Sequence, residues 1–179
     1  MTDSELIKTI RIVPNYPMMG IQFFDVTTVF KNPVAFKEVV DRICALYADK
    51  GITKVAGIES RGFIAGAAIA DRLGAGFVPV RKPGKLPAQT VSESYVKEYG
   101  RDTIEMHSDA IGEDDVVLIH DDILATGGSM EAAIELVKKL GVKKVYVNCL
   151  IELEGLNGRQ YLEGKSDGLE CLFGIEVNE

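Results

Sequence analysis

The sequence contains few cysteines and fewer basic than acidic residues. Its three cysteines lie far apart and form no CxxC pair, which predicts buried thiols in a reducing compartment rather than a disulfide framework or a zinc site: Cys44, Cys149 and Cys171. Twenty Lys and Arg against 27 Asp and Glu give a formal charge of −7 at pH 7. Because no overall positive field would attract a phosphate backbone, we expect no nucleic-acid partner.

Signals for a membrane or for secretion are also lacking. No stretch approaches the roughly 18 consecutive apolar residues that cross a bilayer, and the amino end, MTDSELIKTIRIVP, places acidic residues early and has no long apolar core. The 18 glycines follow no three-residue period, and 46% of the residues are apolar, which excludes collagen-like and disordered chains. We therefore expect a globular, cytoplasmic protein with no membrane partner.

Strand-like and helical apolar patterns alternate along the chain. The segment 33–50 carries apolar residues at helical spacing, with Asn32 placed to cap the helix and Gly51 to end it. Further strands are expected at 53–58, 76–80, 114–122 and 142–152, and further helices within 59–74 and at 129–140. This alternation predicts an α/β fold in one domain of 179 residues, with a mostly parallel twisted sheet flanked by helices.

A glycine-containing turn follows the apolar run VVLIH. It combines two hydroxyl side chains with two glycines and opens a predicted helix, at residues Ala125, Thr126, Gly127, Gly128 and Ser129. Closely approaching backbone amides and the positive end of a helix favour a bound anion. The turn therefore predicts a phosphate site, and the absence of a GxxxxGK[ST] pattern excludes a Walker loop.

Two carboxylates, Asp121 and Asp122, immediately precede this turn. In isolation, such a pair more often caps a turn than binds a ligand. A pocket for phosphate alone would avoid negative side chains, whereas carboxylates accept hydrogen bonds from hydroxyl groups. We therefore expect a ligand that presents both an anion and hydroxyls, and a ribose phosphate meets this requirement.

The stretch VVLIHDDILATGGS resembles the phosphoribosyl pyrophosphate signature of the type I phosphoribosyltransferases. Four further stretches are similar, in order and approximate spacing, to those of the adenine phosphoribosyltransferase family: YPMMGIQFFD, GIESRGF, VRKPGKLP and SYVKEYG. The resemblance covers nearly the whole chain. It implies a Rossmann-like fold with a small amino-terminal hood at about residues 12–30 and a mobile lid at about residues 81–100.

The resemblance implies a pentosyltransferase of purine salvage. Adenine and 5-phosphoribosyl 1-pyrophosphate would give AMP and pyrophosphate, with Mg²⁺ held mainly by substrate and water rather than by protein ligands, and the protein would be a homodimer. Positive charge builds on the ribose as its anomeric C–O bond breaks. By this analogy Asp121 and Asp122 would bind the ribose hydroxyls and stabilise that charge, while residues 125–129 would hold the 5-phosphate.

The resemblance assigns pyrophosphate binding to two stretches. Glu59, Ser60 and Arg61 would form a turn with a cis peptide bond between the first two residues, and Arg61 would supply a bidentate donor. The start of the lid would add the positive charges of Arg81, Lys82 and Lys85. Without the resemblance, three such charges would more often belong to a solvated loop.

The segment from Arg81 to about Gly100 has no clear periodicity, which indicates either a functional loop or an element that the pattern does not reveal. As a lid, it would exclude water from the activated sugar when it closes. The resemblance places Tyr95 and Tyr99 in this lid. It also assigns proton transfer at the purine N7 to Glu98.

The resemblance assigns recognition of the base to the hood. Phe23 would stack on adenine, and the backbone of Gln22 and Phe24 would read its Watson-Crick edge. The sequence departs from the family pattern at three positions. Met19 stands where a proline is usual, Phe24 where a basic residue is common, and His120 where an apolar residue precedes the acids.

Alternatives remain open at this point. Hypoxanthine, xanthine or orotate would replace adenine if the hood were selective for another base, and a nucleotide-sensing regulator would bind the donor without catalysis. The presence of Arg61, Glu98 and the paired acids favours an enzyme. For residues 153–164, the sequence does not distinguish a contribution to the site from a simple connection between strands.

Overall fold

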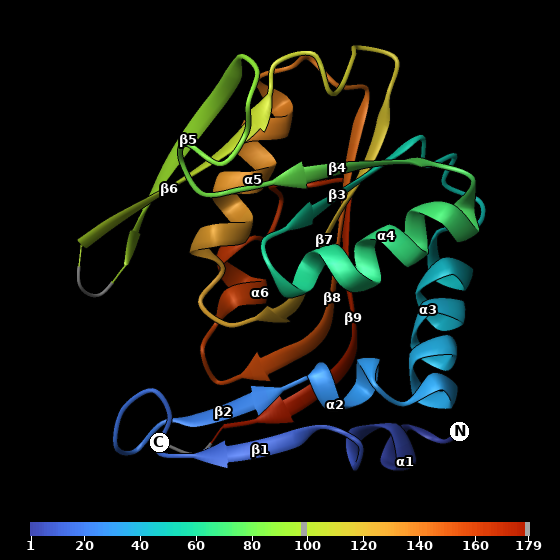
Figure 1. Ribbon diagram of the computed structural model, residues 1–179, viewed down its shortest axis with the longest axis vertical. Coiled ribbons are helices and arrows are strands. Elements are labelled where there is room, and N and C mark those ends of the chain that lie inside the picture. Colours follow the sequence, from blue (N-terminus) through green and yellow to red (C-terminus); the bar gives the residue numbers. More distant parts are fainter. Residues whose placement is uncertain (98–99, 178–179) are drawn as a thin grey trace.

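A five-stranded sheet forms the centre of the protein. The computed structural model describes residues 1–97 and 100–177 (Figure 1). The strands of the sheet are β3 (Lys54–Ile58), β4 (Gly76–Val80), β7 (Val116–Leu124), β8 (Lys144–Glu154) and β9 (Gly168–Glu176). Their order is β4-β3-β7-β8-β9, and each pair of neighbours runs parallel. The predicted α/β fold with a mostly parallel sheet is confirmed.

Helices cover both faces of this sheet (Figure 1). One face carries α3 (Pro33–Tyr47) and α4 (Arg61–Leu73), and the other carries α5 (Gly128–Lys138). Leu118 and Leu150 belong to the core on the side of α3 and α4, whereas their neighbours Ile119 and Cys149 belong to the core on the side of α5. Because alternate side chains of a strand face opposite sides, covering both faces requires the continuous apolar runs that the sequence contains.

The ends of the helices agree with the local sequence signals. The Asn32 side chain accepts hydrogen bonds from the backbone nitrogens of Val34 and Ala35, as its predicted capping role requires. Gly74 ends α4 in the left-handed conformation, at a φ of 67°. Among the described residues, no helix is both long and apolar enough to cross a membrane.

The hood, residues 12–30, lies beside the carboxyl-terminal end of β9 at the bottom of Figure 1. The elements of this end of the chain are α1 (Asp3–Ile7), β1 (Arg11–Pro14), β2 (Gln22–Asp25) and α2 (Thr27–Phe30). β1 and β2 pair antiparallel, with Val13 opposite Phe23. Phe24 is only 2% exposed and packs with the core, so that its side chain joins the hood to the rest of the protein.

The segment from Arg81 to about Gly100, for which the sequence left open a functional loop or an unrecognised element, contains a strand in its second half. β5 (Thr90–Lys97) pairs antiparallel with β6 (Gly100–His107), and the two strands form an outer ribbon. Alternate side chains of β5 face inward, but one inward position is occupied by Glu93, whose carboxylate pairs with Lys139 of the chain beyond α5 at 2.6 Å. A charged residue at an inward position interrupts the alternation of apolar and polar residues that identifies a strand.

Two further boundaries differ from the sequence-based expectation. The strand predicted at 114–122 spans Val116–Leu124, so it begins and ends two residues later than expected and still contains Asp121 and Asp122. β9 was not predicted at all, and its sequence GLECLFGIE contains two glycines and two glutamates. A strand at the edge of a sheet needs fewer apolar residues than a central strand, which explains why its pattern was weak.

Candidate active site

The carboxyl-terminal ends of β3 and β7 bring the two predicted ligand-binding turns together. These strands are neighbours and run parallel, so the turn that starts α4 lies beside the end of β7. A Cβ atom on Gly62 would lie 2.8 Å from the backbone oxygen of His120 and 3.2 Å from Oδ1 of Asp121. Only glycine permits this close approach, and the sequence thereby sets Arg61 beside the paired acids.

Arg61 and Asp122 form an ion pair at the centre of the site. The Arg61 Nε donates to Oδ2 of Asp122, whose side chain is only 6% exposed. Burial acts to lower the pKa of Arg61, but the hydrogen bond and the charge of Asp122 outweigh burial and raise it. The Arg61 guanidinium also lies over the ring of Phe23, 5.4 Å from the ring centroid. One side chain therefore connects the α4 turn, the acids and the hood.

Asp121 lies directly beside Asp122 on β7. Burial, together with the negative charge of Asp122, raises the pKa of Asp121 well above its usual value. The backbone nitrogen of Asp122 donates to Oδ1 of Asp121 at 2.9 Å. The pair thus combines a carboxylate that is bound by Arg61 with a carboxyl that favours its proton, and together they can accept and donate hydrogen bonds to a diol.

The predicted phosphate loop, residues 125–129, connects β7 to α5. Gly127 has a φ of 90° and precedes the first residue of α5, and no side chain caps this helix. The exposed Thr126 and the half-buried Ser129 place hydroxyl groups at the same end. The first amides of a helix have no partner within it, so they are available to an anion. The geometry fits a bound phosphate.

The second predicted turn, between β3 and α4, contains a cis peptide bond between Glu59 and Ser60, as the resemblance implied. The Glu59 carboxylate accepts hydrogen bonds from the backbone nitrogen of Lys82 and from the Arg81 guanidinium, the latter at 3.3 Å. Glu59 therefore holds the residues that follow β4 beside the site. Its negative charge is engaged by these two residues.

The basic residues predicted to bind pyrophosphate differ in their surroundings. Lys85 is exposed, whereas the Lys82 ammonium is paired with Asp102 on β6. Asp102 also pairs with Lys97 at 2.5 Å and accepts a hydrogen bond from the Tyr95 hydroxyl at 3.1 Å. Hydrogen bonds from Lys82 and Lys97 hold the pKa of Asp102 well below its usual range. Nothing in the local sequence indicates a role for Asp102, because its partners lie on other segments.

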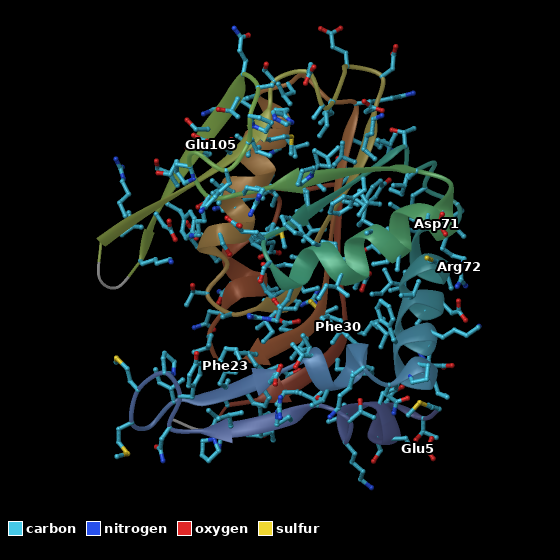
Figure 2. All side chains as sticks on the ribbon, viewed as in Figure 1. Glu5, Phe23, Phe30, Asp71, Arg72 and Glu105 are labelled. Carbon is cyan, nitrogen blue, oxygen red and sulfur yellow. The ribbon has the colours of Figure 1, made fainter. Side chains whose placement is uncertain are left out.

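The hood side of the site contains the three residues predicted to bind a base. Phe23 is half-buried, projects from β2 (Figure 2), and packs edge-on against Tyr16 with ring centroids 5.1 Å apart. Gln22 is exposed, and Phe24 points into the core. Only the backbone of Phe24 therefore remains available to a ligand, in agreement with the backbone role expected for it.

His120 belongs to a buried polar network behind the acids. Its Nδ1 lies 2.9 Å from Oδ1 of Asn148 on β8, and the Asn148 amide donates to the backbone oxygen of Glu170. Burial lowers the pKa of His120 from 6.5 to about 4, against the opposing effects of Asn148 and of the charge on Asp122. A neutral His120 is therefore part of the packing that supports the end of β7.

The cysteines are free thiols. Cys44 and Cys149 are buried and Cys171 is half-buried, but Cys149 and Cys171 lie opposite each other on β8 and β9, so they are less scattered than the sequence indicated. Within residues 1–97 and 100–177, no group of three or more His, Cys, Asp or Glu side chains is arranged to hold a metal ion. The predicted residues Glu98 and Tyr99 lie outside the described residues.

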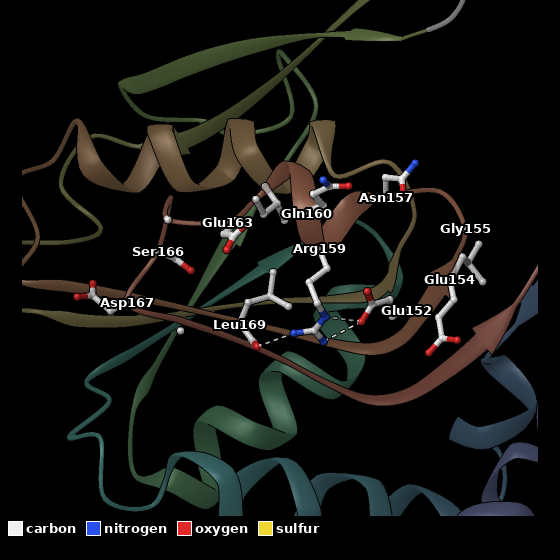
Figure 3. A pocket seen from close by; sticks show the side chains of 14 residues that line it. Glu152, Glu154, Gly155, Asn157, Arg159, Gln160, Glu163, Ser166, Asp167 and Leu169 are labelled. Atoms are coloured by element: carbon white, nitrogen blue, oxygen red, sulfur yellow. Dashed lines mark hydrogen bonds and ion pairs between the residues drawn. The ribbon is translucent and has the colours of Figure 1, made fainter.

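A cavity of about 580 Å³ lies between β8, β9 and the short helix α6 (Gly158–Tyr161), as Figure 3 shows. Its lining includes Glu152, Arg159 and Leu169 and none of the predicted site residues. The candidate active site therefore consists of the side chains and backbone amides described above, and this cavity is not part of it. The sequence assigned no role to α6.

Comparisons with known proteins agree with the geometry. The model of the phosphoribosyl transferase domain family matches residues 20–171. An adenine phosphoribosyltransferase of Bacteroides fragilis is 61% identical over 167 residues, which cover 93% of this chain and 94% of that protein.

Two solved structures of adenine phosphoribosyltransferases are similar over almost the whole chain. The structure from Rhodothermus marinus has a TM-score of 0.90 and 49% identity, and the match covers 96% of this chain and 97% of the other. The structure from Giardia lamblia, in complex with 9-deazaadenine, has a TM-score of 0.93 and 42% identity, with 99% of each chain covered.

Proposed function

The chain belongs to the adenine phosphoribosyltransferase family, and from this premise we propose that it transfers the phosphoribosyl group of 5-phosphoribosyl 1-pyrophosphate to adenine in purine salvage. The products are AMP and pyrophosphate, and Mg²⁺ is required. The observation that carries this proposal is the position of the Arg61–Asp122 pair and Asp121 beside the uncapped amino-terminal end of α5. These groups match a ligand that has two anionic ends and a diol between them.

The ribose and its 5-phosphate occupy the end of β7. The amides at the start of α5 and the hydroxyls of Thr126 and Ser129 bind the 5-phosphate, while Asp121 and Asp122 bind the 2- and 3-hydroxyls. Both ends of the sugar are then fixed while its anomeric bond breaks. The negative charge of Asp122 favours the positive charge that develops on the ribose.

The pyrophosphate leaves toward the turn between β3 and α4. Arg61, Arg81 and Lys82 supply positive charge there, with Lys85 and the ribbon completing the lid. Mg²⁺ would be held mainly by oxygen atoms of the donor and by water, because magnesium keeps several water ligands and rarely needs an all-protein site. When bound with the donor, Mg²⁺ neutralises negative charge on the leaving group.

Adenine binds between the hood and the ribose. Phe23 provides the stacking ring, and the backbone of Gln22 and Phe24 distinguishes a 6-amino from a 6-oxo purine. Glu98 accepts the proton that adenine loses. Tyr95 and Tyr99 close over the reacting groups, and the protein acts as a cytoplasmic homodimer.

A panel of bases tests this function. Wild-type protein is incubated with 5-phosphoribosyl 1-pyrophosphate, Mg²⁺ and either adenine, hypoxanthine, guanine, xanthine or orotate, and nucleotide formation is followed. Because a site that reads a hydrogen-bonding edge discriminates strongly, we expect kcat/KM for adenine to exceed the others by at least about 100-fold. Equal turnover of the bases would contradict the assignment of the hood, and donor binding without turnover of any base would favour a regulator.

A further inference from the structure

The short helix α6 packs directly against the phosphate loop. A Cβ atom on Gly158 would overlap the backbone oxygen of Ala125 and would lie 3.1 Å from Cδ1 of Leu124. Real Cβ atoms do not approach a backbone oxygen so closely, so a larger residue would displace either α6 or the loop. The contact makes the position of Ala125 dependent on the position of α6.

Gly127 meets α6 at three further points. A Cβ atom on Gly127 would lie 3.1 Å from Cδ1 of Tyr161, 3.2 Å from the backbone oxygen of Gly158 and 3.3 Å from Cγ of Leu162. Gly127 also has a φ of 90°, which favours glycine. The loop therefore follows the surface that α6 presents, and the ring of Tyr161 is part of this surface.

Two side chains, Tyr161 of α6 and Lys165 just beyond it, bind Glu131 in the first turn of α5. The Tyr161 hydroxyl donates to Oε2 of Glu131, and the Lys165 ammonium binds Oε1. The Lys165 Nζ lies 4.0 Å from the centroid of the Tyr161 ring. Hydrogen bonds from Lys165 and Tyr161 lower the pKa of Glu131, whose backbone nitrogen bonds to Gly127 at 2.8 Å. Both oxygens of the Glu131 carboxylate are thus bound, one by Tyr161 of α6 and the other by Lys165 just beyond it.

The other side of α6 is tied to the sheet. In Figure 3, Arg159 points across the cavity to Glu152 of β8, with Nε and Nη2 at 2.8 and 2.7 Å from Oε2. Its Nη1 donates to the backbone oxygen of Leu169 on β9 at 3.2 Å. These bonds fix α6 relative to the sheet, so α6 connects the sheet to the phosphate loop.

We propose that Tyr161 is a positioning residue for the 5-phosphate, supported by Gly158 and Lys165. It touches no substrate and acts through Glu131 and Gly127, which set where the amides of the loop point. Residues 157–165 are thus part of the phosphate site and more than a connection between strands. This inference rests on the proposed function, because it requires the loop to bind the phosphate of a ribose phosphate.

The test compares AMP with adenosine, which differ only in the phosphate. Calorimetry on the full chain gives the Kd of each for wild type, Tyr161→Phe and Gly158→Ala. In Tyr161→Phe the Glu131 carboxylate loses the hydrogen bond from the Tyr161 hydroxyl, so the amides of the loop are held less firmly. We expect AMP binding to weaken about tenfold, which corresponds to the free energy of about one hydrogen bond to a charged group. Adenosine binding should change less than about twofold, and the circular dichroism spectrum of the variant should match that of the wild type.

Kinetics provide a second readout. Tyr161→Phe should raise KM for 5-phosphoribosyl 1-pyrophosphate about tenfold and change kcat less than about twofold, because uniform binding of the phosphate is lost. Gly158→Ala should have the larger effect, and Gly112→Ala is its matched control, since a Cβ there would have only the Asp115 side chain nearby, at 3.9 Å. If Gly158→Ala fails to fold, the inference is tested by Tyr161→Phe alone.

A double-mutant cycle distinguishes an indirect from a direct role. If Tyr161 acts through Glu131, Tyr161→Phe should add less than about twofold to the loss of AMP affinity caused by Glu131→Gln. Equal weakening of AMP and adenosine, or unchanged AMP affinity in Tyr161→Phe, would overturn the inference. A wild-type protein that forms no AMP would instead overturn the proposed function, so the two failures are distinguishable.

Discussion

The two ends of the proposed donor site are built in different ways. At the 5-phosphate end, glycines at 127 and 158 let backbone lie against backbone, and the neighbouring acid Asp122 is buried against Arg61. At the pyrophosphate end, the ribbon is held by ion pairs such as Lys82 with Asp102, whose side chains are 40% and 22% exposed. Closely packed backbone can adopt few alternative positions. Partly exposed ion pairs contribute little free energy, so they break and form again readily.

This difference matches what each end has to do. The 5-phosphate is unchanged by the reaction, so a rigid cradle can bind it equally well throughout. The pyrophosphate must enter with the donor and leave as product, which requires groups that can open. Substitutions at the buried end should therefore have large effects, and substitutions in the ribbon should have small ones.

The largest expected effect comes from Asp122→Asn. The change keeps the shape but removes the charge that faces Arg61 and the ribose, so we expect kcat to fall at least about 100-fold while the circular dichroism spectrum is unchanged. Asp41→Asn is the matched control, because Asp41 pairs with Lys37 and Arg72 on the outer helices, away from the site. A kcat within threefold of wild type for Asp122→Asn would remove this acid from the mechanism.

An intermediate effect is expected from the histidine behind the acids. The pKa of His120 falls from 6.5 to about 4 on folding, so between these pH values the unfolded chain binds a proton that the folded chain does not. Stability should therefore decrease as the pH is lowered through this range, by on the order of 3 kcal/mol from this residue. Urea unfolding of wild type and His120→Leu at pH 7, 6, 5 and 4 measures the difference in slope.

His107 provides the control for this experiment. It is the other histidine of the chain and lies half-buried in β6, where Ala88 donates to its Nε2 at 3.4 Å. His120→Leu should flatten the pH slope of the wild type, and His107→Gln shows what the loss of a histidine outside the buried network does. Parallel curves for wild type and His120→Leu would show that His120 does not titrate in a buried site.

The smallest effect is expected in the ribbon. Asp102→Asn releases Lys82 and Lys97, so we expect KM for 5-phosphoribosyl 1-pyrophosphate to fall about two- to threefold at low salt. Raising the salt concentration should remove this difference, because partly exposed ion pairs are screened. Asp109→Asn, an exposed acid just beyond β6, serves as the control. A loss of kcat above tenfold in Asp102→Asn would contradict the proposed contrast between the two ends.

The sequence predicted the parts of the protein whose signals are local. Continuous apolar runs identified β3, β7 and β8, and the glycine-containing turn after VVLIH identified the phosphate loop. The two acids were also recognised, although the extra length of β7 was not. Each of these features depends on neighbouring residues, so a single window of sequence contains the necessary information.

Features that depend on distant residues could not be predicted in this way. The strand β5 was not recognised because Glu93 interrupts its alternation of apolar and polar residues. The partner that explains this buried charge, Lys139, lies 46 positions later in the sequence. Tyr161 and Glu131 are separated by 30 positions and come together only through the fold. The sequence around Gly158 does not indicate its role, because the close approach of the Ala125 backbone exists only in the folded protein. The supporting parts of a site are therefore harder to predict than the residues that contact the ligand.

The most direct test of the account is a crystal structure with 5-phosphoribosyl 1-pyrophosphate and Mg²⁺ bound. We expect the 5-phosphate to contact the backbone amides of 127–129 and the ribose hydroxyls to contact Asp121 and Asp122. We also expect the pyrophosphate to face Arg61. A donor bound elsewhere, or bound with its 5-phosphate away from the start of α5, would contradict the account.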